Sequence, residues 1–302
     1  MNASTTASQK IATRFAPSPS GLLHLGHAYS ALFAQRLAAS GEGRFVLRIE
    51  DIDPGRCKPE FEDAIVEDLA WLGLEWEEPF LRQSERLDVY ANALTQLDKA
   101  GLLYPCFCTR SDIAAEIKQA GAAPHLGHHG PDGPLYPGTC KHLNESERAQ
   151  RLADNQPHAL RLDMDAAISA AGNLTWHDRT HGEQNAQPEL FGDIVLARKD
   201  VATSYHLAVT VDDAAQGITL VTRGNDLFAA THIHRLLQAL LDLEVPEWHH
   251  TVLLVNNKGK RLAKRDKAFT LRAMREAGTD PEDIWAMSIR QIARQAAATD
   301  GI

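Results

Sequence analysis

The sequence predicts an α/β protein with a mostly parallel sheet. Short apolar stretches with strand character alternate with amphipathic helical stretches along the first hundred residues, which is typical of βαβ crossovers. Hydrophobic residues make up 44% of the 302 residues, enough to build a substantial core. No apolar run approaches the roughly 18 residues that a membrane-spanning helix needs, and residues 1–10 carry no apolar signal-peptide core. We therefore expect a cytoplasmic protein with no membrane partner.

The N-terminal elements follow one another in a regular order. After a flexible tail at 1–12, a strand is expected at 13–19 and a helix at 28–40, ending at a glycine. A second strand at 43–51 leads through an acidic turn into a helix at 60–74, and another helix follows at 84–101. Residues 13–103 are accordingly predicted to form the first half of the main domain.

The amino-acid composition of the sequence changes between residues 104 and 188. This segment is rich in Gly, Pro and His and shows little periodicity, which indicates an insertion made largely of loops. Strand character is expected to return at 189–200 and 205–224, followed by a helix at 226–243. We predict that 189–257 completes the main domain and that 258–302 holds a loop and C-terminal helices.

The stretch SPSGLLHLGH, residues 18–27, combines two glycines with two histidines just before a predicted helix. Gly21 and Gly26 let the backbone turn tightly, and a helix beginning near His27 directs its N-terminal amides toward an anion such as a phosphate. His24 and His27 can donate hydrogen bonds to phosphate oxygens during phosphoryl or nucleotidyl transfer. A zinc-binding pair, or a helix start with surface histidines, is the alternative.

A basic segment contrasts with the formal net charge of −9, which argues against non-specific coating of nucleic acid. Residues 258–275 are rich in Lys and Arg, and within them GKRLAKRD at 259–266 follows a strand-like stretch. Such a loop can clamp a polyphosphate, with Lys264 as a point charge. Alone, it would be interpreted as a solvated run of charge.

Three cysteines cluster in the insertion: Cys106, Cys108 and Cys140. With a fourth ligand they would satisfy tetrahedral zinc and stabilise a segment that is poor in apolar residues. The alternative is free buried thiols. Ligand statistics favour His125, His128 or His129 as the fourth ligand, and Cys57 lies apart from the group.

Taken as a pair, HLGH at 24–27 and RLAKR at 261–265 resemble the two signatures of class I aminoacyl-tRNA synthetases. The resemblance implies a Rossmann-like α/β catalytic domain with an inserted zinc-binding subdomain and a short C-terminal helical segment. It also implies catalytic roles for His24, His27 and Lys264. Ala263 departs from the family pattern, which has serine there, but Lys264 is retained. The implied ATP-binding residues are Pro17, His24, Gly26, His27, Arg261, Leu262 and Lys264.

RFAPSPSGLLHLGH, followed by RIEDID, is similar to the glutamyl group of that class. The resemblance implies that Glu50 holds the substrate ammonium, and that one structural Zn²⁺ is bound by the three cysteines with Tyr136 as the fourth ligand. ATP is expected as a substrate together with Mg²⁺. The other implied glutamate-binding residues are Arg14, Ala16, Ser18, Tyr205 and Arg223.

The acceptor of the glutamyl group is expected to differ from that of a full-length family member. Residues 265–302 are fewer than the roughly 50 that a domain usually needs, so no anticodon-binding domain is expected after Lys264. The chain thus resembles shortened paralogues that glutamylate queuosine, at the first anticodon position of tRNA(Asp), and we expect a monomer. Alternatives are a catalytic core that charges a tRNA 3′ end, a non-catalytic RNA-binding protein, and a small-molecule nucleotidylyltransferase.

Overall fold

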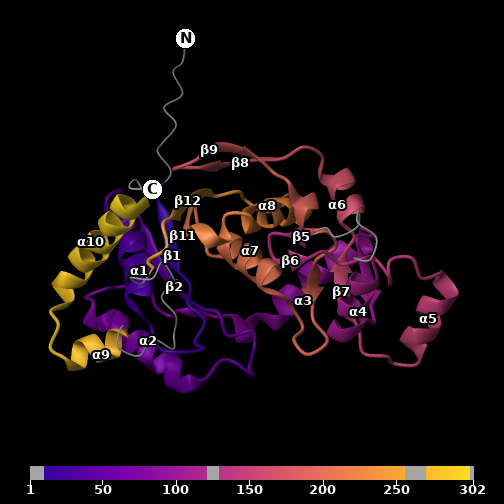
Figure 1. Ribbon diagram of the computed structural model, residues 1–302, viewed down its shortest axis with the longest axis horizontal. Coiled ribbons are helices and arrows are strands. Elements are labelled where there is room, and N and C mark those ends of the chain that lie inside the picture. The colour runs from indigo at the N-terminus through magenta and orange to yellow at the C-terminus, as the bar shows by residue number, and fades with distance from the viewer. Residues whose placement is uncertain (1–9, 121–128, 256–269, 300–302) are drawn as a thin grey trace, which may run out of the picture.

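The computed structural model describes residues 10–120, 129–255 and 270–299, and its centre is a parallel sheet (Figure 1). Strands β1 (Ala12–Phe15), β2 (Arg44–Ile49) and β3 (Leu81–Arg82) pair in that order, all parallel. On the other side of β1 lie β11 (Leu220–Gly224) and β12 (Glu247–Thr251), which are parallel to each other. The backbone N–H of Thr219 donates to the carbonyl of Ala12 at 3.0 Å, which joins the two groups of strands. The predicted α/β class is confirmed.

Helices pack against strands β1 and β2 and build the first core. α1 (Leu25–Ala39) connects β1 to β2, and α2 (Pro59–Trp71) precedes β3. α10 (Pro281–Thr299), which follows the short α9 (Leu271–Glu276), packs along α1 at one end of the molecule (Figure 1). The side chains of α1, β2 and α2 form one apolar cluster, which includes Leu47, Ile65 and Leu69, none of them exposed. This core fixes the turn between β1 and α1.

The insertion contains more regular structure than its Gly and Pro content predicts. β4 (Leu103–Cys106) pairs antiparallel with β7 (Ala159–Leu162), and β10 (Val195–Ala197) pairs with the other edge of β7, so this sheet crosses the predicted boundary at residue 188. β8 (Thr175–Asp178) pairs with β12 and with β9 (Gly182–Asn185). The remaining elements are α4 (Arg110–Ala120), β5 (His129–Gly130), β6 (Gly133–Pro134), α5 (Glu145–Ala153) and α6 (Met164–Ala171).

The expectation of strand structure throughout 205–224 is wrong for its first half. Tyr205–Ala215 is helix α7, capped by Ser204, whose hydroxyl accepts from the N–H of Leu207, and only then does β11 begin. Residues Leu207 to Asp213 of α7 are all buried, so the helix shows no polar face from which a 3.6-residue period could be recognised.

The remaining helices complete a second core. α7 packs against α8 (Ala230–Leu240), which confirms the helix expected there, and α3 (Leu87–Lys99) covers α7 from another side. Short 3₁₀ turns lie at η1 (Gln83–Arg86), η2 (Pro188–Phe191) and η3 (Asn225–Leu227). Among the described residues, none of the helices is both long and apolar enough to cross a bilayer.

Candidate active site and cysteine cluster

The predicted substrate residues meet at the carboxyl ends of the central strands. Arg14 belongs to β1, Glu50 follows β2, Arg223 belongs to β11, and Tyr205 is the first residue of α7. The N–H of Glu50 donates to the carbonyl of Pro17 at 3.0 Å, which ties the β1–α1 turn to the end of β2. Ligands of open parallel sheets bind at this edge, where the loops that follow the strands converge.

Arg14 is held by an ion pair and a carbonyl. Its Nε and Nη2 donate to the two carboxylate oxygens of Asp213 at 2.9 and 3.3 Å, and its Nη1 donates to the carbonyl of Thr222 at 2.9 Å. An arginine has five N–H donors, so one hydrogen on Nη1 and one on Nη2 are left by these contacts. The side chain is buried, and its positive charge is matched inside the protein.

Glu50 shares this ionic cluster through Arg48. The fully buried Arg48 donates to Asp213 at 2.8 Å and to Glu50 Oε1 at 3.2 Å. Burial raises the pKa of Glu50 above its usual range, although the charges of Arg48 and Arg14 oppose that shift. The pKa of Asp213 stays below its usual range, because the same two arginines outweigh the effect of burial.

Arg223 is held by neutral acceptors. Its Nε donates to His250 Nε2 at 3.1 Å, its Nη1 to His234 Nδ1 at 3.0 Å, and its Nη2 to the hydroxyl of Thr231 at 2.6 Å. Among the described residues, no carboxylate forms an ion pair with it, whereas Arg14 and Arg48 each pair with Asp213. Burial lowers the pKa of this guanidinium from its usual value, as expected for a cation with few compensating charges.

Tyr205 lies near both arginines. Burial raises the pKa of its phenol, and the charges of Arg223, Glu50, Arg14 and Asp213 all act on it, so these groups lie close together in the predicted substrate pocket. Ala16 and Ser18 are half-buried in the adjoining turn, where the Ser18 hydroxyl lies 3.7 Å from the sulfur of Cys57. The structure thus brings the predicted residues together, while their contacts with a substrate stay predictions.

The HLGH motif forms the N-terminus of α1. His24 is the N-cap, and its Nδ1 accepts from the N–H of Gly26 at 3.1 Å, while His27 Nδ1 accepts from the N–H of His24 at 3.2 Å. The rings stack with centroids 3.8 Å apart. A Cβ on Gly26 would lie 3.1 Å from the His24 ring, so glycine leaves room for it. Because both Nδ1 atoms accept, a neutral ring carries its proton on Nε2, as a phosphate donor requires.

Residues on both sides of the second predicted signature contact the first. Thr270 forms a β-bridge with His24, the N–H of Leu271 donates to the carbonyl of Leu23 at 2.9 Å, and Leu254 lies beside Gly26. The signature itself, with Arg261, Leu262, Ala263 and Lys264, lies outside the described residues. Leu254 and Thr270, which flank the signature in the sequence, therefore both lie beside the HLGH turn.

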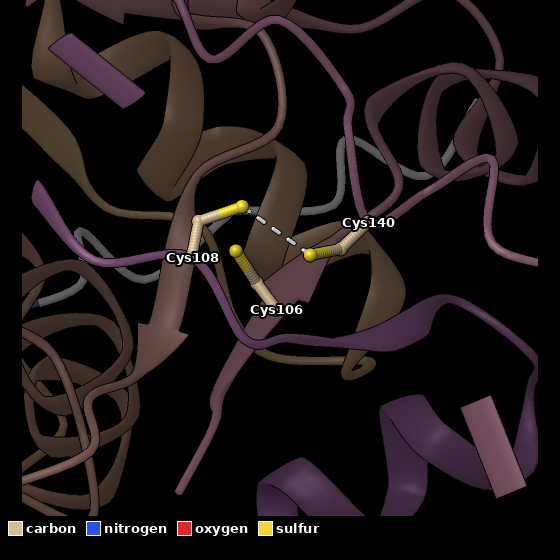
Figure 2. A group of neighbouring side chains, drawn as sticks. All are labelled: Cys106, Cys108 and Cys140. Atoms are coloured by element: carbon tan, nitrogen blue, oxygen red, sulfur yellow. Dashed lines mark hydrogen bonds between the residues drawn. The ribbon is translucent and has the colours of Figure 1, made fainter. Parts of the chain in front are cut away.

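The three cysteines of the insertion converge on one point (Figure 2). Their sulfurs lie within 4.8 Å of one another, with Cys108 and Cys140 at 3.4 Å. A tetrahedral zinc with bonds of about 2.3 Å to sulfur needs sulfurs roughly 3.8 Å apart, so the spacing fits such an ion. The cluster is compatible with a metal site.

Tyr136 provides a fourth donor atom at the cluster. Its phenolic oxygen lies 3.4 Å from the sulfur of Cys106 and 3.6 Å from that of Cys108. Arg161 lies over its ring, with the guanidinium carbon 3.7 Å from the centroid. His129 is described but does not join the cysteine group, and His125 and His128 lie outside the described residues.

The thiols differ in how readily they ionise. Burial raises the pKa of Cys108 to about 11. Burial acts in the same direction on Cys140, but hydrogen bonds from Tyr136 and from the N–H of Phe107 lower its pKa below the usual value. A cation at this point would favour the thiolate form of all three.

A βαβ sheet with an HxGH motif at the start of its first helix, and with two buried arginines on the neighbouring strands, is the arrangement expected for the catalytic domain of a class I tRNA synthetase. The sequence model of the family described as tRNA synthetases class I (E and Q), catalytic domain, matches residues 10–299. The chain belongs to this family and is a ligase.

Relatives with curated names fall into two groups. A glutamyl-Q tRNA(Asp) synthetase of Rhodobacter capsulatus is 50% identical over 90% of this chain and 97% of its own length. A glutamate–tRNA ligase of Aquifex aeolicus is 38% identical over 91% of this chain but only 56% of its own length. A crystal structure of a glutamate tRNA ligase from Elizabethkingia meningosepticum superposes with a TM-score of 0.73 at 30% identity, covering 85% of this chain and 52% of that one.

Several groups around the pocket were not predicted from the sequence. Asp213, His234 and His250 contact the two arginines directly, and Arg48 links Asp213 to Glu50. Arg48 stands two residues before Glu50 in RIED, and Asp213 closes the TVDD stretch that follows Tyr205. Each of these two charged residues stands in an otherwise apolar stretch. That pattern could have indicated a buried ion pair, since charged residues are rarely buried without a partner.

Proposed function

We propose that this protein activates L-glutamate with ATP, giving glutamyl-adenylate, and then transfers the glutamyl group to queuosine at the first anticodon position of tRNA(Asp). The pocket that gathers Arg14, Glu50, Tyr205 and Arg223 carries the first half of the proposal. Cationic and acidic side chains in one partly dry pocket suit an amino acid that has two carboxylates and an ammonium.

The acceptor is inferred from the relatives. The glutamyl-Q tRNA(Asp) synthetase of Rhodobacter capsulatus is matched over nearly its whole length, whereas the glutamate–tRNA ligase of Aquifex aeolicus is matched over little more than half. Two further relatives, from Nocardia farcinica and Symbiobacterium thermophilum, share the first name at 44% and 42% identity.

In the proposed first step, an oxygen of the glutamate α-carboxylate attacks the α-phosphorus of ATP. The new C–O–P bond forms as the bond to pyrophosphate breaks, and negative charge accumulates on the departing phosphates. The Nε2 donors of His24 and His27 and the ammonium of Lys264 would balance this charge together with Mg²⁺. In the second step a queuosine hydroxyl attacks the glutamyl carbonyl, an ester bond forms as the acyl–phosphate bond breaks, and the hydroxyl proton passes to the phosphate of the departing AMP.

Two assays separate the proposal from its alternatives. Glutamate-dependent exchange between ATP and pyrophosphate tests activation, and its absence in a folded protein would favour a non-catalytic RNA-binding role. Labelled glutamate is then offered with tRNA(Asp) that carries or lacks queuosine. We expect label only on the first tRNA; equal labelling without queuosine would point to charging of a tRNA 3′ end.

We further propose that the cysteine cluster binds one structural Zn²⁺ through Cys106, Cys108, Cys140 and Tyr136. The donor atoms suit the ion, and they come from two distant segments, since Cys106 ends β4 and Cys108 follows it, whereas Tyr136 and Cys140 lie about thirty residues further along the chain. A zinc ion in this position would cross-link β4 to the chain around residue 140. Binding of such an ion adds roughly 10 kcal/mol or more of apparent free energy in zinc-finger peptides.

Replacing Cys140 with serine tests the metal proposal. We expect the Cys140→Ser variant to lose zinc and to unfold at a lower temperature, because the thiolate is the preferred ligand. Elemental analysis and calorimetry measure both effects. Cys57→Ser is the matched control, since Cys57 lies by the turn at Ser18 and not in the cluster. Retention of one zinc per chain in the Cys140 variant would refute the assignment.

A further inference from the structure

The contacts of Arg223 fix which ring nitrogen of each neighbouring histidine carries a proton. A guanidinium can only donate, so His250 Nε2 and His234 Nδ1 must both be acceptors. Neutral His250 therefore has its proton on Nδ1, which lies 2.7 Å from a carboxylate oxygen of Asp178. Neutral His234 has its proton on Nε2, which lies 3.2 Å from His206 Nδ1.

Asp178 holds the tautomer of His250 in place. One of its oxygens accepts from the N–H and Nδ1–H of His250, and the other accepts from the N–H groups of Thr180 and His181. Both oxygens therefore face donors, and the aspartate cannot present a proton to the ring. His250 is in turn the register partner of Arg223 on the neighbouring strand, so the pairing of β11 and β12 sets their contact.

A second arm runs from Arg223 through His234 to His206. The remaining nitrogen of His206, Nε2, lies 3.7 Å from a carboxylate oxygen of Asp132. Both arms thus end at an aspartate, but each aspartate is separated from the guanidinium by one or two imidazole rings. The hydrogen bonds orient Arg223 without placing a negative charge against it.

We propose that His234 and His250 are positioning residues that hold Arg223 as an oriented cation with no ion-paired carboxylate among the described residues, and that this arrangement makes the pocket select an acidic substrate over its amide. The inference rests on the proposed activation of glutamate. Burial of an unpaired cation is unfavourable, so the ligand-free pocket favours a group that brings a negative charge. Glutamate supplies that charge on its side chain, whereas glutamine does not.

The lowered pKa values of the two histidines support this arrangement. Burial and the charge of Arg223 lower the pKa of His250 to about 4 and that of His234 well below its usual value. Both rings are therefore neutral at physiological pH, as acceptors of an arginine N–H must be.

Two variants of His234 that differ only in charge test the proposal. An Asn side chain places an oxygen where His234 presents Nδ1, so His234→Asn keeps a neutral acceptor for Arg223. His234→Asp places a carboxylate at the same point. We expect His234→Asn to bind glutamate within about threefold of wild type, and His234→Asp at least about tenfold more weakly, with a smaller preference for glutamate over glutamine and an unchanged KM for ATP.

Calorimetric titration of glutamate and of glutamine measures binding without catalysis, and ATP–pyrophosphate exchange measures the two KM values. Equal glutamate affinity in the Asn and Asp variants would overturn this inference. If the wild-type protein still catalyses ATP–pyrophosphate exchange, the proposed function would remain intact. A wild-type protein without exchange would overturn the proposed function itself.

His250 offers a second test that does not depend on how the His234 variants fold. Gln at 250 can reach Arg223 Nε with an oxygen, whereas Leu of similar volume cannot. We expect His250→Leu to raise the KM for glutamate by about tenfold or more and His250→Gln to restore much of it, with kcat and the KM for ATP less affected. The same KM for glutamate in both variants would contradict a positioning role.

Discussion

The two arginines of the pocket use the same three nitrogen positions and differ in the charge of their acceptors. On the Arg14 side, Nε and Nη2 meet the carboxylate of Asp213 and Nη1 meets a carbonyl. On the Arg223 side, Nε and Nη2 meet His250 and Thr231, and Nη1 meets His234. The first side is neutralised by Asp213, whereas no carboxylate among the described residues forms an ion pair with the second.

This difference separates stability from recognition. A buried ion pair with satisfied hydrogen bonds orients its members and is costly to break, but it offers little net charge to a ligand. A buried cation among neutral acceptors is less favourable in the free protein and attracts an anion more strongly. The predicted pocket therefore contains one arginine, Arg14, whose charge is matched by Asp213, and another, Arg223, whose hydrogen bonds go to neutral acceptors.

Removal of the negative charge on the Arg14 side should have the largest effect on stability. Asp213→Asn leaves Arg14 and Arg48 buried beside a neutral amide, and we expect the free energy of unfolding to fall by about 3–5 kcal/mol. Urea denaturation measures the loss. Glu77→Gln is the control, because its pair with Arg44 is about half exposed and is expected to contribute at most ~1 kcal/mol. A loss at Asp213 no larger than at Glu77 would remove the contrast between the two sides.

The sequence pointed to the substrate residues of the predicted pocket but not to the residues that hold them. Arg14, Glu50 and Arg223 stand in stretches that resemble a family, so they could be assigned before any geometry was known. Asp213 was missed because α7 is buried on nearly every side, and a helix without a polar face lacks the period that identifies it.

His250 and His234 were missed for a different reason. They reach Arg223 only through the parallel pairing of β11 with β12 and the packing of α8, and a pairing between distant segments leaves no local pattern in the sequence. The cysteine cluster shows the opposite case. Its residue types are informative by themselves, and the structure brings all three sulfurs together.

Acidification should weaken the two sides over different pH ranges. Unfolded histidine has a pKa near 6.5 and His250 has one of about 4, so the folded state binds fewer protons, and stability falls as the pH drops from about 6.5 to 4. Asp213, with a lowered pKa, contributes stability that is lost only as the pH falls below about 4. The histidine side is therefore expected to weaken first.

The difference between wild type and His250→Gln isolates this contribution. We expect the stability advantage of wild type to shrink by up to about 3 kcal/mol between pH 7 and 4, measured by urea denaturation at several pH values. The comparison is needed because Asp68, whose pKa burial raises to about 6, has the opposite dependence. Parallel curves for the two proteins would show that His250 is not held neutral by its surroundings.

The smallest effect is expected at Thr231, which provides one of three neutral acceptors to Arg223 and is fully buried. Thr231→Val keeps the shape of the side chain but removes the oxygen, leaving one N–H of the guanidinium without its partner. We expect a loss of about 1.5–3 kcal/mol in the free energy of unfolding, because the hydrogen bond involves a charged donor, and a rise of about fivefold in the KM for glutamate. Thr231→Ser keeps the oxygen, so its free energy of unfolding and its KM for glutamate should both lie close to those of the wild type. If Val and Ser behave alike, the hydroxyl is not what orients Arg223, and the two histidines alone account for its position.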